Sequence, residues 1–421
     1  MQKIAVLGGV RIPFARSFGA YSGISNQELM TASLKGLVEK YHLQNHILGE
    51  VALGTVMAHS ADWNFARECA LGCGISAESP AYTITQACGT SLEAAILIRN
   101  KIALGQIDVG IAGGADTNSD LPVVFSRSFA HKLLKLSRAK NIVEKLQIIS
   151  QLRPKDLLPV TPAVQEPRTG LSMGESCELT AKKWRITREE QDAIAYISHM
   201  NALKAYKDGF YDNLLVPFYG LNKDNNVRET TLEKMAKLSP VFDRSKSGTL
   251  TAANSSTLTD GSAAILLSSD TWAARMELPV LAHMTHCEVA AVDFVKDEGL
   301  LMAPTYAVSR MLKKANLNLQ DFDFYEIHEA FAAQVLCTLK AWESEEFCRT
   351  KLGLNSALGS IDRKKMNVCG GSIALGHPFA ATGARIVSAL AKILHKKGSG
   401  RGLISICTGG GMGVTAILEK N

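Results

Sequence analysis

The stretch from Ala81 to Ile98 reads AYTITQACGTSLEAAILI and carries the signals of an α/β fold. Ala81–Thr85 is typical of an extended strand, and Leu92–Ile98 is typical of a helix. Gly89 and its small neighbours mark the turn between the two elements. Cys88 is therefore predicted to lie where a strand ends and a helix begins.

A thiol at that position is a candidate nucleophile. The positive end of the helix dipole and the free backbone N–H groups would both favour the thiolate, which is the reactive form. The alternative is a buried core cysteine, which is a common role for cysteines in intracellular proteins. The remainder of the chain decides between these two interpretations of Cys88.

Strand and helix alternate through the first 120 residues. A strand is predicted at Ile4–Leu7, and a helix from about Asn26 to Lys40 with Ser25 or Asn26 as its N-cap. After the Cys88 helix, the apolar run Asp108–Ala115 predicts a buried strand that continues into a glycine turn.

The C-terminal part repeats this order. His377 is predicted to open a helix with Pro378 in its first turn. A strand at Gly402–Ile406 follows, and then the glycines Gly409–Gly411. The repetition predicts a duplicated α/β unit with a site at the interface between its two halves.

The alternation breaks at about residues 117–247, which are richer in Lys, Arg, Pro and polar residues. We predict an inserted, mainly helical lobe that includes the basic helical segment Arg127–Lys155. The predicted domains are residues 1–270, which contain this insertion, and residues 271–421.

The composition limits the class of protein. A chain of 421 residues with 46% hydrophobic residues, 6% aromatic residues and 34 glycines suits a soluble α/β protein of two or more subdomains. The net charge of +6 is mild and dispersed; it does not indicate a nucleic-acid partner, but it suits an anionic small ligand.

Cysteine usage indicates a reduced compartment. The nine cysteines are odd in number, and Cys69 and Cys73 have no second pair with which to complete a metal site. No secretory h-region precedes the first strand, and no apolar run reaches the roughly 18 residues of a membrane span. We expect a cytoplasmic protein, or an organellar one if a leader was removed.

Three further residues could take part in chemistry with Cys88. His377 lies between Gly376 and Pro378 at a predicted helix start, where the dipole keeps the ring neutral, as a base must be; it could also merely cap a turn. Cys407 precedes Gly409–Gly411, whose N–H groups could bind an oxyanion or, equally well, a phosphate.

His328 ends the extended run 323–326 and begins a His-Glu pair. A metalloprotease helix is rejected, because the second histidine four residues later is absent. Alone, His328 could be a strand-end histidine bonded to its neighbours. Together with Cys88, His377 and Cys407, it permits covalent acyl transfer: one thiolate carries the acyl group, a histidine activates it, and a second thiol handles the proton α to a thioester.

At this level the sequence resembles the thiolase family over essentially its whole length. The motifs that carry the resemblance occur in the family's order and are Gln86–Ser91, His328–Gln334, Gly371–Pro378 and Cys407–Gly413. The resemblance implies a thiolase fold, with two duplicated βαβ-type halves in a layered αβαβα arrangement and an inserted, mainly helical loop domain.

The resemblance also implies residue roles. Cys88 would be the acylated nucleophile, His377 would activate it, and His377 and His328 would hold the thioester oxygen. Cys407 would act as acid and base on the acetyl-CoA carbanion. The N–H groups of Cys88 and Gly409 would form a second oxyanion hole. Ser256 would contact the pantetheine arm of CoA, and the candidates for the CoA phosphates are Lys182, Lys183 and Arg185.

His328 is similar to the residue of degradative 3-ketoacyl-CoA thiolases, where biosynthetic acetoacetyl-CoA thiolases usually carry Asn. Phe242–Arg244 and the basic stretch Phe129–Leu136 are most similar to the β subunit of the fatty-acid oxidation trifunctional complex. In that relative the stretch is tied to a partner subunit or a membrane surface; the alternative is an amphipathic lid over the acyl tunnel.

The expected reaction is therefore thiolysis of 3-ketoacyl-CoA by CoA. CoA would be a co-substrate, with no tightly bound cofactor and no metal. The expected ligands are acyl-CoA and CoA. The chain is expected to form a homodimer or homotetramer, and to contact a hydratase/dehydrogenase α subunit or a membrane surface. The alternatives are a biosynthetic acetyl-CoA C-acetyltransferase, a decarboxylating ketosynthase and a non-catalytic acyl-CoA-binding scaffold.

Overall fold

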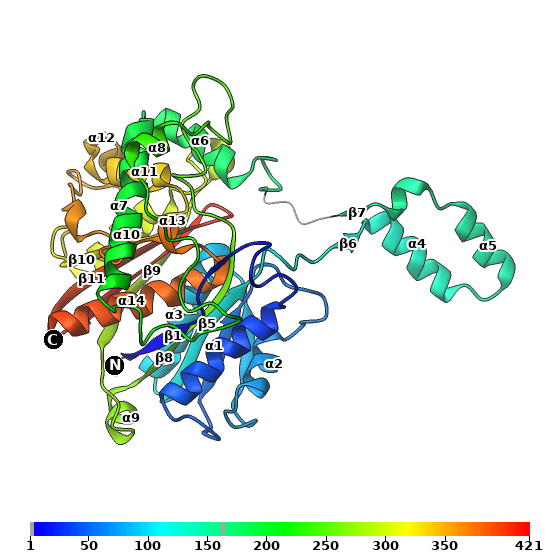
Figure 1. Ribbon diagram of the computed structural model, residues 1–421, viewed down its shortest axis with the longest axis horizontal. Coiled ribbons are helices and arrows are strands. Elements are labelled where there is room, and N and C mark those ends of the chain that lie inside the picture. Colours follow the sequence, from blue (N-terminus) through cyan, green and yellow to red (C-terminus); the bar gives the residue numbers. More distant parts are fainter. Residues whose placement is uncertain (1–3, 161–164) are drawn as a thin grey trace.

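The computed structural model describes residues 4–160 and 165–421 (Figure 1). The strands are β1 (Ile4–Arg11), β2 (Ala15–Arg16), β3 (Glu50–Gly54), β4 (Ala81–Ile84), β5 (Val109–Asp116), β6 (Val124–Phe125), β7 (Pro159–Val160), β8 (Thr259–Ser269), β9 (Ala282–Ala291), β10 (Phe324–Ile327), β11 (Gly400–Thr408) and β12 (Met412–Lys420). The helices are α1 (Asn26–Lys40), α2 (Phe65–Gly72), α3 (Thr90–Ala103), α4 (Arg127–Arg138), α5 (Ile142–Ser150), α6 (Met173–Lys183), α7 (Arg188–Lys207), α8 (Leu232–Ala236), α9 (Asp270–Arg275), α10 (Ala303–Ala315), α11 (Ala332–Glu343), α12 (Glu345–Thr350), α13 (Ser372–Leu375) and α14 (Thr382–Lys397). The single 3-10 turns are η1 (Ala87–Gly89), η2 (Pro154–Leu157), η3 (Phe294–Lys296), η4 (Arg363–Lys365) and η5 (Phe379–Ala381).

The main sheet consists of two halves joined by one short contact. Its order is β10-β11-β12-β9-β1-β8-β5-β3-β4, with β2 beside β8. Within the described residues, β1 and β9 join the halves through two residue pairs, Ala5 with His283 and Val6 with Ala282. The two halves can therefore bend away from each other and enclose helices between them.

The helices complete five layers. α3 and α14 pack against each other and against strands of both halves, so they form the central layer. α1 and α2 cover the outer face of the N-terminal half, and α10 covers the outer face of the C-terminal half, with α11 beside it. Every residue of α14 from Thr382 to Leu394 is buried, as expected for a helix enclosed by sheets on both sides. The predicted αβαβα arrangement is confirmed.

The predicted duplication is visible in the element order. In the N-terminal half the turn η1 leads into α3 and then β5; in the C-terminal half η5 leads into α14 and then β11. The two turns contact each other, which brings the start of α3 next to the start of α14. Small residues permit this approach: a Cβ on Gly383 would lie 2.4 Å from the backbone nitrogen of Leu92.

Two local predictions were wrong. Gly113 and Gly114 lie inside β5, not in a turn after it, and a Cβ on Gly114 would lie 2.4 Å from the carbonyl oxygen of Ala380. These glycines therefore make room for the η5 turn. The helix predicted to open at His377 begins only at Thr382. His377 itself is extended, because its N–H donates to Thr259 Oγ1 at 2.7 Å and it bridges to Leu258.

The helix predicted from Asn26 to Lys40 is confirmed, and Ser25 is its N-cap. The Ser25 side chain accepts from the N–H of Glu28, and the Glu28 carboxylate accepts from the N–H of Ser25. This reciprocal pair is a capping box, which satisfies two backbone donors at once.

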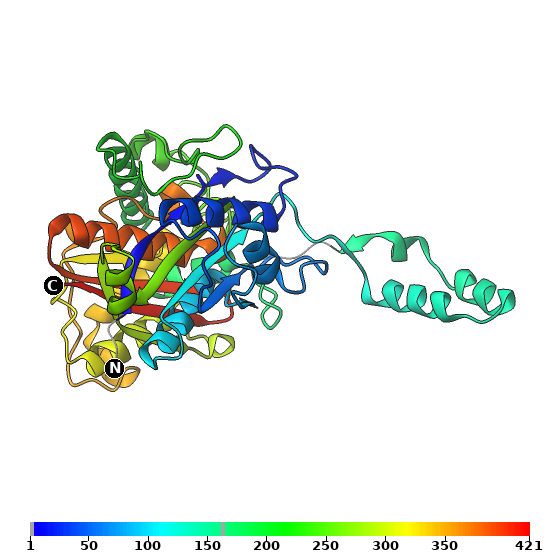
Figure 2. The ribbon, with the colours of Figure 1, turned by 90° about the horizontal axis from the view of Figure 1, so that it is seen from below.

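The predicted insertion is helical but forms two separate parts. Residues 165–247, with α6, α7 and α8, pack on the C-terminal half, where Cys177 and Ala181 join the core around α11. Residues 124–160 form an arm in which α4 and α5 pack against each other, and the arm projects away from the body (Figures 1 and 2). Because the arm projects from the body (Figures 1 and 2), its role stays a prediction: a contact with a partner or a membrane, or a lid over the acyl tunnel. No helix within the described ranges is long and apolar enough to cross a bilayer.

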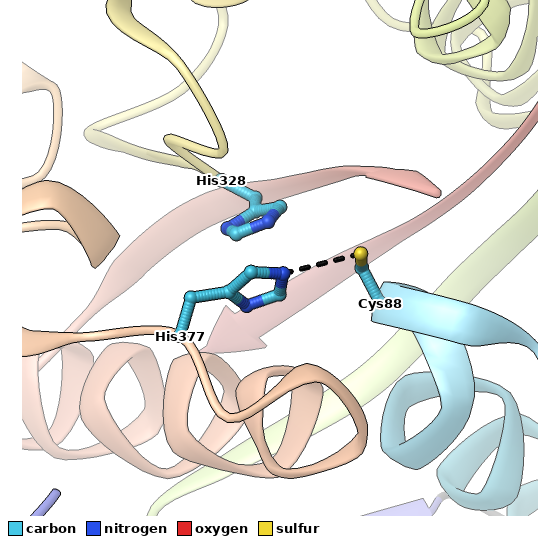
Figure 3. Close-up of side chains that lie close together, drawn as sticks. All are labelled: Cys88, His328 and His377. Atoms are coloured by element: carbon cyan, nitrogen blue, oxygen red, sulfur yellow. Dashed lines mark hydrogen bonds between the residues drawn. The ribbon is translucent and has the colours of Figure 1, made fainter. Parts of the chain in front are cut away.

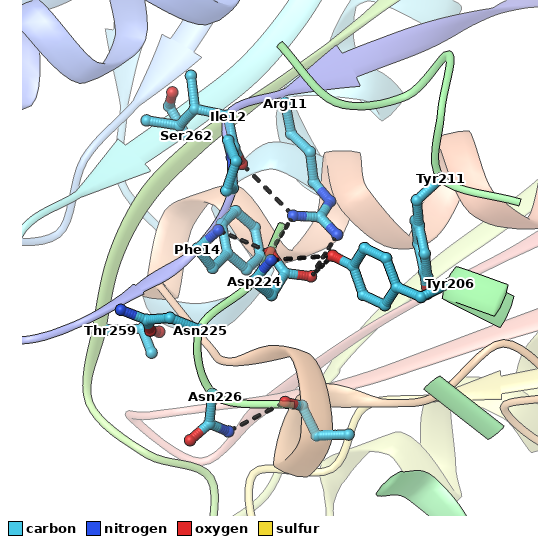
Figure 4. Close-up of polar contacts among 12 residues, drawn as sticks. Arg11, Ile12, Phe14, Tyr206, Tyr211, Asp224, Asn225, Asn226, Thr259 and Ser262 are labelled. Atoms are coloured by element: carbon cyan, nitrogen blue, oxygen red, sulfur yellow. Dashed lines mark hydrogen bonds and ion pairs between the residues drawn. The ribbon is translucent and has the colours of Figure 1, made fainter. Parts of the chain in front are cut away.

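A buried ion pair ties the insertion to the first strand (Figure 4). Arg11, at the end of β1, donates to both oxygens of Asp224 at 2.5 and 2.7 Å. Asp224 also accepts from the N–H of Phe14 and the hydroxyl of Tyr206, each at 2.7 Å. Although burial lowers the pKa of Arg11, the carboxylate raises it above its usual value. Arg11 is therefore charged and depends on Asp224.

We expect Asp224→Asn to lower the free energy of unfolding by about 3–5 kcal/mol, because it leaves the Arg11 charge buried without a counter-charge. Urea denaturation followed by circular dichroism measures the change. Asp208→Asn is the matched control, because Asp208 pairs with Lys204 on the exposed surface and the urea midpoint should hardly move. Equal midpoints for the two variants would show that the buried pair contributes little.

Candidate active site

Cys88 lies in the turn η1, at the start of the central helix α3. Ala87 before it has a φ of 45°, a left-handed conformation that a non-glycine residue rarely adopts. This strained turn directs the Cys88 side chain toward the C-terminal half (Figure 3). The residue is only partly buried, so a substrate can reach it.

His377 faces Cys88 from the other half. Its Nε2 lies 3.1 Å from Cys88 Sγ, and its Nδ1 lies 2.6 Å from Thr382 Oγ1 at the start of α14. The two contacts fix the ring from both sides. Burial lowers the pKa of His377 to about 3, and the nearby Arg385 cation lowers it too. The ring is neutral, as predicted, but burial rather than a helix dipole is the main cause.

His328 lies directly after β10 and its ring lies beside that of His377, with centroids 4.2 Å apart (Figure 3). Its Nδ1 is 2.8 Å from Ser372 Oγ, and its Nε2 has no partner among the described residues. Burial, His377 and Arg385 together lower its pKa well below the usual value. A neutral, unpaired ring nitrogen is thus available for a ligand.

Cys407 and Gly409 belong to the C-terminal half, as do the two histidines. Cys407 lies near the end of β11, inside the strand rather than just past it, and is buried. Burial raises its pKa well above the usual value, and the proximity of Cys88 adds to this. The backbone N–H groups of Gly409 and of Cys88 itself each lower the pKa of the Cys88 thiol. Two amides are therefore near the reacting sulfur.

The prediction that the resting Cys88 is a thiolate was wrong. Burial raises its pKa to about 12, more than the two amides lower it. Both partners of the Cys88–His377 contact are therefore neutral, and the sulfur keeps its proton until it attacks. Transfer of that proton to His377 has to accompany bond formation.

We expect alkylation of Cys88 by iodoacetamide to accelerate steadily between about pH 6 and pH 9, because the thiolate fraction of a thiol with a raised pKa grows tenfold per pH unit. A thiolate–imidazolium pair would instead react at a high and constant rate from about pH 6. Intact mass gives the rate, and a Cys88→Ala variant corrects for the other thiols. A flat profile would contradict the neutral pair.

Ser256 lies in a loop that contacts the segments of both histidines. Its N–H donates to the carbonyl of Ala330 at 3.0 Å, close to His328, and Leu258 bridges to His377. The residue is half-buried. Of the candidates for the CoA phosphates, Lys182 pairs with Asp243 and Lys183 with Asp297, so these two cations already have carboxylate partners.

Several residues near the site were not anticipated. Thr382 orients His377, and Ser372 contacts His328. Arg385 donates to Ser372 Oγ at 2.7 Å from inside α14; an arginine beside the apolar run of this helix was the signal that could have identified it. Glu166 accepts from the N–H of Gly410 at 2.6 Å and so holds the glycine turn next to Gly409.

Cys88, His328 and His377 each place one donor atom within 4.8 Å of the other two. Within residues 4–160 and 165–421 they are the one group of three such side chains that could hold a metal ion. A thiolate and two imidazoles would suit zinc. Covalent acyl transfer uses the same sulfur and nitrogens, so a bound metal would compete with it.

Comparison with known proteins places this site in a family. The family description "Thiolase, N-terminal domain" matches residues 4–271, and "Thiolase, C-terminal domain" matches residues 278–420. The 3-ketoacyl-CoA thiolase of Photobacterium profundum is 43% identical over 99% of this chain and 97% of its own length. That of Shewanella baltica is 42% identical with the same coverage.

Solved structures agree. The acetyl-CoA acetyltransferase of Bacillus anthracis superposes with a TM-score of 0.82 at 31% identity, over 100% of this chain and 99% of its own. The Acat5 thiolase of Ascaris suum, solved in complex with coenzyme A, gives the same TM-score at 28% identity over the full length of both chains. With both family descriptions matched in order and relatives similar from end to end, the chain belongs to the thiolase family.

Proposed function

We propose that this thiolase is an acetyl-CoA C-acyltransferase that cleaves 3-ketoacyl-CoA with CoA, yielding acetyl-CoA and a shortened acyl-CoA, as in fatty-acid β-oxidation. The contact of 3.1 Å between Cys88 Sγ and His377 Nε2 carries the proposal, because it pairs a nucleophile with a base across the interface of the two halves. The full-length relatives named 3-ketoacyl-CoA thiolase support the choice of substrate.

In the first step, Cys88 Sγ attacks the C3 carbonyl of the substrate while its proton passes to His377 Nε2. The negative charge moves to the carbonyl oxygen, where the N–H groups of Cys88 and Gly409 donate to it. Both amides already lower the pKa of the Cys88 thiol. Fixed backbone donors stabilise such an oxyanion because they need no reorganisation during the reaction.

In the second step, the tetrahedral intermediate collapses and the C2–C3 bond breaks. Cys88 keeps the shortened acyl group as a thioester, and the electron pair leaves with C2 as the enolate of acetyl-CoA. His328 and His377 hold the enolate oxygen, and Cys407 gives its proton to C2. Acetyl-CoA leaves, and the site then holds a Cys407 thiolate and a protonated His377.

The second half of the reaction restores the enzyme. The CoA thiol gives its proton to Cys407 and attacks the acyl-Cys88 thioester. The shortened acyl-CoA departs, and His377 returns its proton to the Cys88 sulfur. CoA thus serves as a co-substrate, and the chemistry requires neither a metal nor a tightly bound cofactor. We infer that Ser256, in the loop that contacts both histidine segments, contacts the pantetheine arm of CoA.

We further infer a division into domains at about residue 270, a homodimer or homotetramer, and a cytoplasmic or organellar location.

Within the arm the apolar side chains Leu134, Ile142 and Leu146 are exposed beside the basic residues Lys135 and Arg138. This combination suits contact with a hydratase/dehydrogenase α subunit or with a membrane surface.

A kinetic series of 3-ketoacyl-CoAs from short to long chain tests the proposed substrate class. We expect kcat/KM to rise beyond the four-carbon substrate. Activity confined to acetoacetyl-CoA would instead favour a biosynthetic acetyl-CoA C-acetyltransferase, an activity supported by the similarity to the enzyme of Bacillus anthracis. If the wild type turned over none of these 3-ketoacyl-CoAs faster than Cys88→Ala does, a non-catalytic acyl-CoA-binding subunit would be favoured.

A further inference from the structure

A buried hydroxyl links His328 to a cation that does not reach the reacting atoms. Ser372 Oγ lies 2.8 Å from His328 Nδ1 and 2.7 Å from the Arg385 guanidinium. A guanidinium can only donate, so the hydroxyl accepts from Arg385. Within the described part of the chain the hydroxyl has no third partner, so His328 Nδ1 is the one acceptor within reach of its single hydrogen.

This arrangement decides which nitrogen of His328 carries the proton. The ring is buried and neutral, so it holds one hydrogen. A hydroxyl that donates to Nδ1 requires the ring hydrogen to be on Nε2. That nitrogen is buried and lacks a partner among the described residues, although it lies beside Cys88 and His377. A buried donor without a partner is costly, and the reacting substrate can supply the missing acceptor.

We propose that Arg385, acting through Ser372, is a positioning residue that fixes His328 as the Nε2–H tautomer, so that His328 donates to the thioester oxygen as the enolate forms. This role rests on the proposed thiolysis. In the opposite tautomer, the Nε2 lone pair would point at the negative charge that develops on the thioester oxygen and would repel it. A tautomer held before the substrate arrives is a preorganised donor.

Arg385 is itself held in place. It is 2% exposed on α14, and the Glu326 carboxylate on β10 lies 4.0 Å away. Burial lowers the pKa of Arg385, while Glu326 raises it and favours the cation. Glu326 and His328 are two residues apart in one segment, so the same chain end supplies both the donor and the acidic side chain that faces its positioning residue. Burial raises the pKa of Glu326 to about 8, although Arg385 lowers it, so Glu326 is a counter-charge in its ionised form.

A comparison in two backgrounds tests the proposal. We expect Ser372→Ala to lower kcat about 10- to 100-fold with little change in KM, because the tautomer is no longer fixed. In a His328→Asn background the same change should cost less than about threefold, because an amide carries its own N–H donor and has no tautomers. Arg385→Met should behave like Ser372→Ala. Ser268→Ala, which removes a buried hydroxyl on β8 that donates to the backbone carbonyl of Ser269, is the matched control.

The tautomer can also be observed directly by nitrogen NMR on histidine-labelled protein. The chain has ten histidines, and the spectrum of His328→Asn identifies the signals of His328. We expect Nε2–H in the wild type and a mixture of tautomers in Ser372→Ala. A wild-type Nδ1–H signal, or equal losses of kcat in both backgrounds, would overturn the proposal. If neither the wild type nor any variant turned over 3-ketoacyl-CoA, the proposed function would fail, while the spectrum would still decide the tautomer.

Discussion

Replacing Cys88 by Ala should lower kcat for thiolysis at least about 10⁴-fold and abolish the acyl-enzyme. The sulfur lies 3.1 Å from His377 Nε2, and the N–H groups of Gly409 and Cys88 lower the pKa of its thiol. Without it, neither the base nor the two donors has a nucleophile to act on. Intact mass after incubation with a 3-ketoacyl-CoA should show the added acyl group on the wild type and none on Cys88→Ala.

A second cysteine serves as the control. Cys287 on β9 is also free and partly buried, but none of its described contacts involves the two histidines. Cys287→Ala should therefore keep its acyl-enzyme and most of its activity. If Cys88→Ala still gained the mass of an acyl group, the nucleophile would be another residue and the proposed first step would be wrong.

Much of the fold could be predicted from the sequence, because its signals are local. The helix of residues 26–40 follows from its capping residue and periodicity, and the order of turn, helix and strand around Cys88 recurs after His377. The spacing of apolar residues also predicts an inserted helical region. These features depend on neighbours within a few residues, which a single sequence displays.

What the sequence could not give depends on contacts between distant segments. The raised pKa of Cys88 comes from burial by both halves, which outweighs the local helix start. His377 lies outside its predicted helix, because Thr259, more than a hundred residues earlier, bonds its backbone. The roles of Ser372 and Arg385 likewise appear only when β10, α13 and α14 are brought together.

The four candidate residues Cys88, His328, His377 and Cys407 were nevertheless found, because each combines a reactive side chain with flexible or small neighbours. The structure brings Cys88, His328 and His377 to one point, and Cys88 lies close enough to Cys407 to raise the pKa of the Cys407 thiol. Their individual roles in catalysis stay predictions. Separating the roles of the two cysteines requires a reaction in which only one of them acts.

Cys407→Ala should separate them. Transfer of an acyl group from acyl-CoA to Cys88 forms no carbanion, so it needs only Cys88, His377 and the two amides. We expect Cys407→Ala to be acylated by acetyl-CoA at a rate within about tenfold of the wild type. Thiolysis should fall at least about 10³-fold, because the enolate of acetyl-CoA then has no positioned acid, and general acid catalysis contributes about 10²–10⁴-fold.

Exchange of the α protons gives the sharpest measurement. The wild type should exchange the methyl protons of acetyl-CoA with deuterated solvent, as followed by NMR, whereas Cys407→Ala should not. Cys337→Ala is the matched control, since Cys337 is equally buried in α11 and, unlike Cys407, has a thiol whose pKa Cys88 does not affect. Burial raises the pKa of the Cys407 thiol well above its usual value, so the acid is fully protonated when the enolate forms. If Cys407→Ala kept both exchange and thiolysis, some other group would have to deliver the proton, and the division of labour between the two thiols would be wrong.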